Sequence, residues 1–250
     1  MTKHYLDFVN SIAFDFCGTL ADLQPASTRI LGSWLEKTYE ARWPRERLSS
    51  VLAQAGAEMP YSSLLIRDEP ARRNHFSRFN SRVLELLGYA GADGESLYEH
   101  FKSHERHWRL KPETTELLRS LRSRGYRVIL ASNFDAMLMS ALSREGVVEL
   151  FDALFISSEI GIEKPDVAFY GHIARSLNCA AHTIAMVGDD AKLDILPAQR
   201  AGFRPILLSE GASGIEGGKH VPDPGYLEIA RLDDILLYAR DLSEAAMSKT

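Results

Sequence analysis

The chain has 250 residues, of which 45% are hydrophobic and 25% charged, an ordinary composition for a globular protein with one large domain or a core and an insert. Its net charge of −5 argues against a general nucleic-acid-binding protein, which would normally present a basic face. Cys17 and Cys179 provide no disulfide framework, and no apolar run approaches the roughly 20 residues that span a bilayer. With no signal-peptide pattern at the N-terminus, we expect a protein of the reducing cytoplasm.

The first predicted strand ends at an acidic side chain. Residues 12–20 read Ile-Ala-Phe-Asp-Phe-Cys-Gly-Thr-Leu, so an apolar run leads to Asp15 and a Gly-Thr turn follows. This pattern predicts a buried strand with Asp15 at its carboxyl edge. In open α/β sheets, ligands bind at that edge.

The next segment, from Pro25 to about Trp108, has helical spacing and no convincing strand. Apolar residues recur every three or four positions, and proline and glycine mark helix starts and ends. Helices are predicted at residues 28–39, 44–55, 68–87 and 94–108.

Strands and helices alternate after Pro112. Strands are predicted at residues 126–131, 153–157, 183–187 and 205–208, and helices at 113–124, 137–145, 168–177 and 194–201. Repeated strand-helix units imply an α/β fold with a doubly wound parallel sheet. We further expect a glycine-rich surface loop at 209–224, an edge strand at 226–231, a closing helix at 233–242 and a frayed tail at 244–250.

Four polar clusters each follow a predicted strand and should therefore share one edge of the sheet. They are Asp15 with Gly18-Thr19, Ser132-Asn133, Lys164-Pro165, and Gly188-Asp189-Asp190 with Asp194. Each cluster alone also has a structural interpretation, such as a capping serine, a capping aspartate or a solvated lysine. Their convergence favours a functional site.

The acidic members of these clusters predict a cation. Two carboxylates ~4 Å apart repel by about 4 kcal/mol at an effective dielectric near 20, so either some protonate or a cation lies among them. A set of oxygen-only ligands favours a hard cation such as Mg²⁺.

The four clusters resemble, in order, motifs I to IV of the haloacid dehalogenase-like (HAD) hydrolases. The resemblance implies that Asp15 is a nucleophile that forms an aspartyl-phosphate. It implies that Gly18, Thr19, Ser132, Asn133 and Lys164 hold the phosphoryl group. It also implies that Asp15, Asp189 and the backbone carbonyl of Cys17 bind Mg²⁺. Asp190 and Asp194 are then expected to lie next to these ligands without binding the metal directly.

The helical segment resembles the small cap of HAD subfamily I, which closes over the active site and selects the substrate. The resemblance implies a core at residues 1–21 and 110–243 and a cap at 22–109, with hinges near 21–24 and 109–112. Arg29, just after motif I, is our first choice for a substrate contact from this cap.

Cys17 departs from the family pattern, because phosphatases of the family carry a second aspartate there, which protonates the leaving oxygen and then activates water. A thiol is mostly neutral at pH 7 and is a poor hydrogen-bond donor. Three interpretations stay open: a phosphatase that prefers leaving groups needing little protonation, a phosphatase with its acid elsewhere, or a weakened relative that only binds a phosphorylated ligand.

Two other classes within the superfamily also lack the second aspartate. Dehalogenases carry a tyrosine there and need no metal, whereas phosphonatases carry an alanine and use a cap lysine. The acidic Gly188-Asp189-Asp190 sequence argues for a metal and against a dehalogenase. We therefore expect Mg²⁺-dependent hydrolysis of a small phosphorylated metabolite, with carbon–halogen or phosphonate hydrolysis as the alternative enzyme activity.

Overall fold

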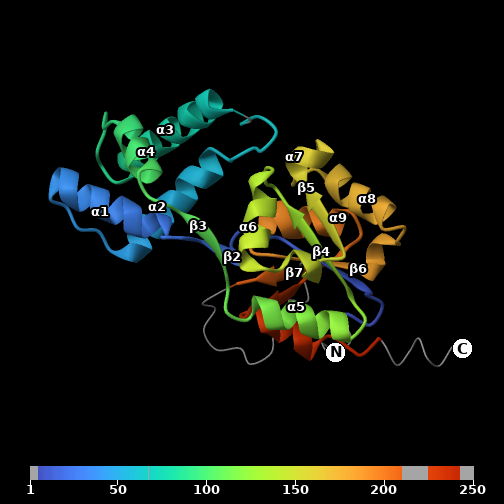
Figure 1. Ribbon diagram of the computed structural model, residues 1–250. Coiled ribbons are helices and arrows are strands. Elements are labelled where there is room, and N and C mark those ends of the chain that lie inside the picture. The colour runs from blue at the N-terminus through green and yellow to red at the C-terminus, as the bar shows by residue number, and fades with distance from the viewer. Residues whose placement is uncertain (1–4, 67, 210–224, 243–250) are drawn as a thin grey trace, which may run out of the picture. The chain divides into compact units, whose positions relative to one another are not determined.

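The computed structural model describes residues 5–66, 68–209 and 225–242 (Figure 1). It contains two compact units, one formed by residues 1–22 and 109–250 and the other by residues 23–108. The loop expected at 209–224, except Ser209, and the tail expected at 244–250 lie outside the described residues.

The first unit is built on a six-stranded parallel sheet in the order β5-β4-β1-β6-β7-β8. The strands are β1 (Ser11–Phe14), β4 (Arg127–Ser132), β5 (Ala153–Ile156), β6 (Ile184–Gly188), β7 (Arg204–Leu208) and β8 (Leu227–Ile229). Every residue of β1 and β6 is buried, as expected for central strands covered on both faces. The predicted doubly wound parallel sheet is confirmed.

Helices connect these strands and supply the two outer layers (Figure 1). The α-helices are α5 (Thr114–Ser123), α6 (Met137–Glu145), α7 (Ser157–Ile160), α8 (Val167–Ser176) and α9 (Leu196–Arg200). Short 3₁₀ segments lie at η2 (Val148–Leu150), η3 (Ala181–Thr183) and η5 (Leu232–Leu237), and a π turn at η4 (Ala191–Ile195). Helices α8 and α9 bury Phe169, Tyr170 and Ala198 against one face of the sheet, in a cluster that includes Ala13 and Ile129.

The chain reverses its direction across the sheet at β1. From β1 it passes to β4 and β5 on one side, and then returns to β6 on the other side of β1. Such a reversal leaves a crevice outside the carboxyl ends of β1 and β6, where doubly wound proteins bind their ligands. Asp15 follows β1 and Asp189 follows β6, so both lie at this crevice.

Three elements differ from the sequence-based expectation. The helix expected at 94–108 ends at Lys102. The chain beyond it forms β3 (His107–Leu110), which pairs with β2 (Ala21–Gln24). The helix expected at 194–201 begins as the π turn η4 and becomes α9 only at Leu196, because Pro197 has no amide hydrogen for a regular helical bond. The closing helix expected at 233–242 is the shorter 3₁₀ segment η5.

The second unit consists mainly of helices. They are α1 (Ser27–Tyr39), α2 (Arg45–Glu58), α3 (Glu69–Leu86) and α4 (Gly94–Lys102). Their buried side chains form a separate hydrophobic core that includes Leu31, Trp34, Val51, Leu84 and Leu97. In neither unit does a described helix have the length and apolar character needed to cross a bilayer.

Residue 94 is a glycine because α3 and α4 approach closely at this point. A Cβ at Gly94 would lie 2.2 Å from the carbonyl oxygen of Ser77 and 2.4 Å from the amide nitrogen of Ser81. The preceding Asp93 caps α4 by accepting a 2.9 Å hydrogen bond from the Glu95 amide. Close packing and capping therefore fix the start of α4 against α3.

Candidate active site

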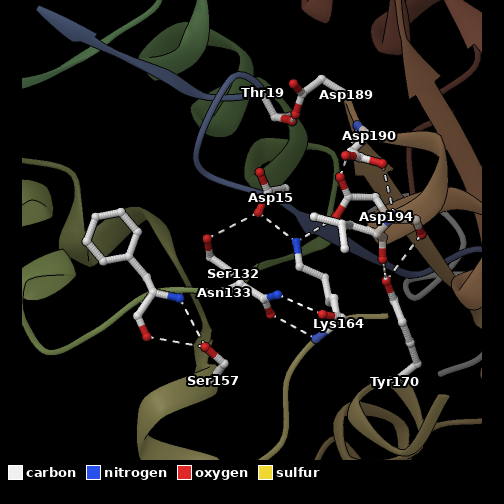
Figure 2. Close-up of polar contacts among 12 residues, drawn as sticks. Asp15, Thr19, Ser132, Asn133, Ser157, Lys164, Tyr170, Asp189, Asp190 and Asp194 are labelled. Atoms are coloured by element: carbon white, nitrogen blue, oxygen red, sulfur yellow. Dashed lines mark hydrogen bonds and ion pairs between the residues drawn. The ribbon is translucent and has the colours of Figure 1, made fainter. Parts of the chain in front are cut away.

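The four clusters predicted to converge do meet at the carboxyl edge of the sheet (Figure 2). Asp15 follows β1, and its amide donates a 2.9 Å hydrogen bond to Val187 O in β6, which extends the pairing of the two strands. Ser132 ends β4, and its hydroxyl donates to Asp15 Oδ1 over 3.1 Å. Neighbouring parallel strands therefore bring side chains from distant parts of the sequence into contact.

Lys164 lies between two carboxylates (Figure 2). Its Nζ donates to Asp15 Oδ1 over 2.7 Å and to Asp194 Oδ1 over 2.6 Å, and only 2% of its side chain is exposed. Burial alone would lower the pKa of Lys164, but the charges of Asp15 and Asp194 outweigh burial and raise it. The lysine is therefore a permanent ammonium ion at the base of the site.

Asn133 holds the backbone that carries Lys164. Its Nδ2 donates to Lys164 O and its Oδ1 accepts from the Lys164 amide, each over 2.8 Å. These paired bonds fix the loop after α7 and so the direction of the ammonium group. The side-chain amide is thus occupied in positioning Lys164, and a direct contact between Asn133 and phosphate stays a prediction.

Three carboxylates form a cluster that could hold a divalent cation. Oxygen atoms of Asp15, Asp189 and Asp194 all lie within 4.8 Å of one another. Burial raises the pKa of Asp194 to about 7 against the opposing charge of Lys164, with the charge of Asp15 adding to the rise. Desolvation and then the charge of Asp15 raise the pKa of Asp189 to about 6, although its side chain reaches solvent. Such crowding of negative charge is what a bound cation would relieve.

Two glycines allow this close approach. Gly18 has a positive φ of 79°, and a Cβ on it would lie 2.3 Å from Asp189 Oδ2. A Cβ on Gly188 would lie 2.3 Å from Asp194 Cγ. Any larger residue at either position would displace a carboxylate of the cluster.

Thr19 and Asp190 contact the cluster in different ways. The Thr19 hydroxyl donates to Asp189 Oδ1 over 3.0 Å. Asp190 Oδ1 caps η4 by accepting from the amides of Lys192 and Leu193, while the Asp190 amide donates to Asp194 Oδ2 over 3.2 Å. The capping interpretation of Asp190 is therefore observed, and its backbone also supports Asp194.

Cys17 is half-buried beside these charges. Burial, followed by the negative charge of Asp15, raises the pKa of its thiol well above the usual value. The side chain is therefore a neutral thiol at physiological pH. It cannot act as a thiolate nucleophile, and it is a weak hydrogen-bond donor.

Sequence reasoning missed two residues that shape the site. Lys111 is buried and donates a hydrogen bond to Gly18 O, and its charge lowers the pKa of Asp189. Tyr170, on the apolar face of α8, donates through its hydroxyl to the carbonyl oxygen of Leu193, and it lies 3.4 Å from Asp194 O. A lysine before a proline and a tyrosine in a helical stripe carry no local signal for such contacts.

Arg29 belongs to the other unit, where it is exposed on α1. Its predicted contact with a substrate therefore stays a prediction.

Sequence comparisons place the chain among known hydrolases. A family model described as haloacid dehalogenase-like hydrolase matches residues 9–202. Glyceraldehyde 3-phosphate phosphatase from Methanothermobacter thermautotrophicus is 33% identical over 50% of this chain and 54% of its own length. Phosphoserine phosphatase from Thermus thermophilus is 28% identical over 69% of this chain and 64% of its own length. The chain thus spans between half and two thirds of the length of these two relatives.

A third relative and a solved structure cover more of the chain. Ribulose-1,5-bisphosphate 5-phosphatase from Halopiger xanaduensis is 30% identical over 79% of this chain and 84% of its own length. The HAD-hydrolase YfnB from Bacillus subtilis superposes with a TM-score of 0.63 at 18% identity, covering 92% of this chain and 99% of YfnB. With its parallel sheet, its four motifs at one edge and the family match over residues 9–202, the chain belongs to the haloacid dehalogenase-like hydrolases.

Proposed function

We propose that this protein is a Mg²⁺-dependent phosphatase of a small phosphorylated metabolite and that it works through an aspartyl-phosphate at Asp15. The observation that carries the proposal is the contact of Asp15 with the buried ammonium of Lys164, beside two further carboxylates. An anionic nucleophile and a fixed positive charge are the two features needed to attack a phosphoryl group and stabilise its charge.

The residues available for a metal fit Mg²⁺. We assign Asp15, Asp189 and the backbone carbonyl of Cys17 as its ligands, with Asp194 close enough to support or join them. A carbonyl ligand does not depend on the side chain, so the cysteine at position 17 is compatible with a metal site. When bound, Mg²⁺ would neutralise the carboxylates and polarise the phosphoryl oxygens.

Asp15 is oriented for the first chemical step. Its Oδ1 accepts hydrogen bonds from Ser132 and Lys164, whereas its Oδ2 accepts none from the described residues. We assign the attack on phosphorus to a carboxylate oxygen of Asp15, which forms a P–O bond while the bond to the leaving oxygen breaks. We expect the Thr19 amide, the Ser132 hydroxyl and the Lys164 ammonium to hold the phosphoryl oxygens. The Gly18 amide donates a 2.8 Å hydrogen bond to Ala21 O, so it is not available for the phosphate contact predicted for it.

The second step returns Asp15 to its starting state. Water attacks the phosphorus of the aspartyl-phosphate, the P–O bond to Asp15 breaks, and inorganic phosphate leaves. In both steps a proton must move, to the leaving oxygen first and from water second. The neutral thiol of Cys17 is poorly suited to either transfer, so we expect a preference for substrates with weakly basic leaving groups, such as acyl or aryl phosphates.

The relatives support the class of substrate. The matched curated proteins are named for hydrolysing phosphate from a triose phosphate, a phosphorylated amino acid and a sugar bisphosphate. These compounds share a small polar body and a phosphate ester. We propose a small phosphorylated metabolite as the substrate of this chain too, but one with a less basic leaving group than these alkyl esters because of Cys17, with the helical unit at 23–108 acting as the cap and Arg29 as a contact.

The test is phosphate release from sugar phosphates, nucleotides, acyl phosphates and an aryl phosphate, with Mg²⁺ or with chelator. Asp15→Asn serves as the blank. Mg²⁺-dependent release that is absent from the blank is the expected result, with acyl and aryl phosphates preferred. Phosphate release that persists in full after chelation would contradict the metal assignment. Halide release from a 2-haloacid that persists after chelation would instead favour carbon–halogen hydrolysis.

One observation favours a second candidate function. Because the thiol of Cys17 is neutral, the site has the groups that bind phosphate but lacks the aspartate that the family uses for proton transfer. A protein that binds a phosphorylated ligand with little turnover would have this arrangement. Tight binding of phosphorylated compounds without release above the Asp15→Asn blank would favour this candidate.

A further inference from the structure

The helical unit contains a cavity of its own. The cavity measures about 550 Å³, and all of its lining residues lie between Leu23 and Arg106, within the unit formed by residues 23–108. This volume falls within the ~300–1,000 Å³ range of small-molecule sites. None of these lining residues is among those assigned to phosphoryl transfer, all of which belong to the other unit.

Aromatic side chains form much of the cavity wall. Phe76, Phe79, Tyr98 and Phe101 line it. The rings of Phe76 and Tyr98 are nearly parallel, with centroids 6.4 Å apart and an interplanar angle of 8°. The Phe79 ring meets Phe76 edge-on, at an angle of 78°. Such walls favour a ligand with a flat apolar body.

Arg106 supplies an unneutralised positive charge to this wall. Its half-buried guanidinium donates to Pro25 O over 3.2 Å and to Ser27 Oγ over 2.8 Å, and it lies 5.5 Å from the Phe101 ring centroid. Among the described residues, no carboxylate forms an ion pair with it, and burial alone lowers its pKa. A partly desolvated guanidinium without a carboxylate is a ready partner for an anion.

The other charged residues of the cavity leave it with an excess of positive charge. Glu69 is the one carboxylate among the described residues of the lining, and it accepts from Lys102 Nζ over 2.7 Å and from Tyr98 OH over 3.0 Å. Arg72 also lines the cavity. Because Lys102 offsets Glu69, the positive charge of Arg106 remains to complement an anionic ligand.

A buried amide adds a further polar contact. Asn80 lines the cavity with only 3% of its surface exposed, and within the described part of the chain its side chain makes one hydrogen bond, from Nδ2 to Gly94 O over 3.4 Å. A buried amide has more hydrogen-bonding capacity than this single long bond uses. Its carbonyl oxygen accepts no hydrogen bond from the described residues, so it can orient a polar group of a ligand.

We propose that this cavity binds a small organic acid with an aromatic body and one carboxylate, which pairs with Arg106. The apolar body packs among the four rings, and the carboxylate enters the positive part of the lining. The proposal concerns the helical unit alone, so it holds whether or not the other unit hydrolyses phosphate esters.

The test uses 3-phenylpropionate and its neutral amide as probes of the full-length protein, with calorimetry to measure binding. A charge-assisted hydrogen bond contributes ~1.5–3 kcal/mol, so we expect the acid to bind at least about tenfold more tightly than the amide. Saturating inorganic phosphate with Mg²⁺ should leave the affinity of the acid unchanged. Equal affinities of acid and amide, or no detectable binding of the acid, would overturn the proposal.

Two variants of Arg106 and one matched control locate the site. Arg106→Gln should weaken binding of the acid at least about tenfold, while Arg106→Lys, which keeps the charge, should retain more of the affinity. Arg82→Gln is the control, because Arg82 lies on α3 outside the lining and pairs with Glu58. Unchanged binding in Arg106→Gln, or displacement of the acid by phosphate, would place the probe elsewhere and refute the proposal. If Arg106→Gln does not fold, the acid and amide comparison on the natural protein decides.

Discussion

Cys17 is the residue that most shapes the expected chemistry. Its thiol lies among Asp15, Asp189 and Asp194, whose negative charges add to burial in keeping it protonated. A neutral thiol is a poor base and a weak donor, so it contributes little to proton transfer. The proposed site therefore combines a candidate nucleophile, a buried cation and a candidate metal cluster, and we expect it to be deficient in acid-base catalysis.

Restoring a carboxylate at this position should repair that deficit. Cys17→Asp should increase kcat for alkyl phosphates by about 10²–10⁴-fold, the usual contribution of a positioned acid or base, with a smaller gain for aryl phosphates. Steady-state phosphate release measures the effect. Cys17→Ser is the matched control and should show no comparable gain, since a hydroxyl does not titrate near neutral pH. An equal response of both variants would contradict this role of position 17.

Lys164 should be essential for both activity and stability. Lys164→Met removes the cation between Asp15 and Asp194 and leaves two buried carboxylates without a positive charge beside them. This change should lower the free energy of unfolding by about 3–5 kcal/mol and phosphatase activity at least ~100-fold. Urea titration and phosphate release measure the two effects. Lys192→Met, on an exposed lysine of the neighbouring π turn, is the control and should be nearly neutral.

The stability loss in Lys164→Met should depend on pH. Burial already raises the pKa of Asp194 to about 7 in the natural protein, and loss of the ammonium should raise it further above its value in the unfolded chain. Stability then falls as pH rises through the folded pKa, so the loss should be larger at about pH 8 than at about pH 5. A loss that is independent of pH would contradict the electrostatic explanation.

At the scale of secondary structure, the sequence predicted most elements of the parallel sheet because buried apolar runs and glycine stops are local signals. The start and end of α6 were predicted to the residue. The pairing of β2 with β3 was missed, because it joins segments more than 80 residues apart and neither has a strong alternating pattern. The irregular start of α9 depends on Pro197 and on capping by Asp190, which a helical period does not reveal.

The contact between α3 and α4 gives a prediction for the helical unit. Gly94→Ala should lower its stability by about 1–3 kcal/mol, because the new methyl group would overlap the backbone of Ser77 and Ser81. Gly56→Ala in α2 is the control, since a Cβ there meets nothing within 4 Å and alanine favours a helix. In denaturant unfolding, the free energy of unfolding of Gly56→Ala should equal or exceed that of the natural protein. Equal stability of the two variants would contradict the close packing.

For the whole molecule, the order of polar clusters along the chain predicted the site better than any single cluster could. Asp15, Ser132, Lys164 and Asp189 come from four segments, and the parallel sheet brings them to one edge. The contacts of Lys111 and Tyr170 could not be predicted, because they depend on the three-dimensional course of the loops. The role of the helical unit as a cap stays a prediction.

Mg²⁺ should stabilise the protein by binding to the cluster of three carboxylates. A ligand present at 100 times its Kd stabilises the state that binds it by about 2.7 kcal/mol, so Mg²⁺ should raise the melting temperature of the natural protein. Asp189→Asn should reduce this shift. Asp166→Asn is the control, because Asp166 caps α8 and is not one of the three clustered carboxylates, and asparagine also caps helices. A full Mg²⁺ shift in Asp189→Asn would contradict the proposed ligand set, whichever substrate the enzyme uses.

The central claim is covalent transfer of a phosphoryl group to Asp15, and it can be measured directly. An aryl phosphate and Mg²⁺ are mixed with the protein, the reaction is stopped with acid after one turnover, and the peptide containing Asp15 is analysed by mass spectrometry. Because Cys17 is a poor base for the hydrolytic step, the phosphorylated peptide should accumulate, and Cys17→Asp should shorten its lifetime. Release of the aryl alcohol without phosphorylation of Asp15, or equal release by Asp15→Asn, would contradict the account.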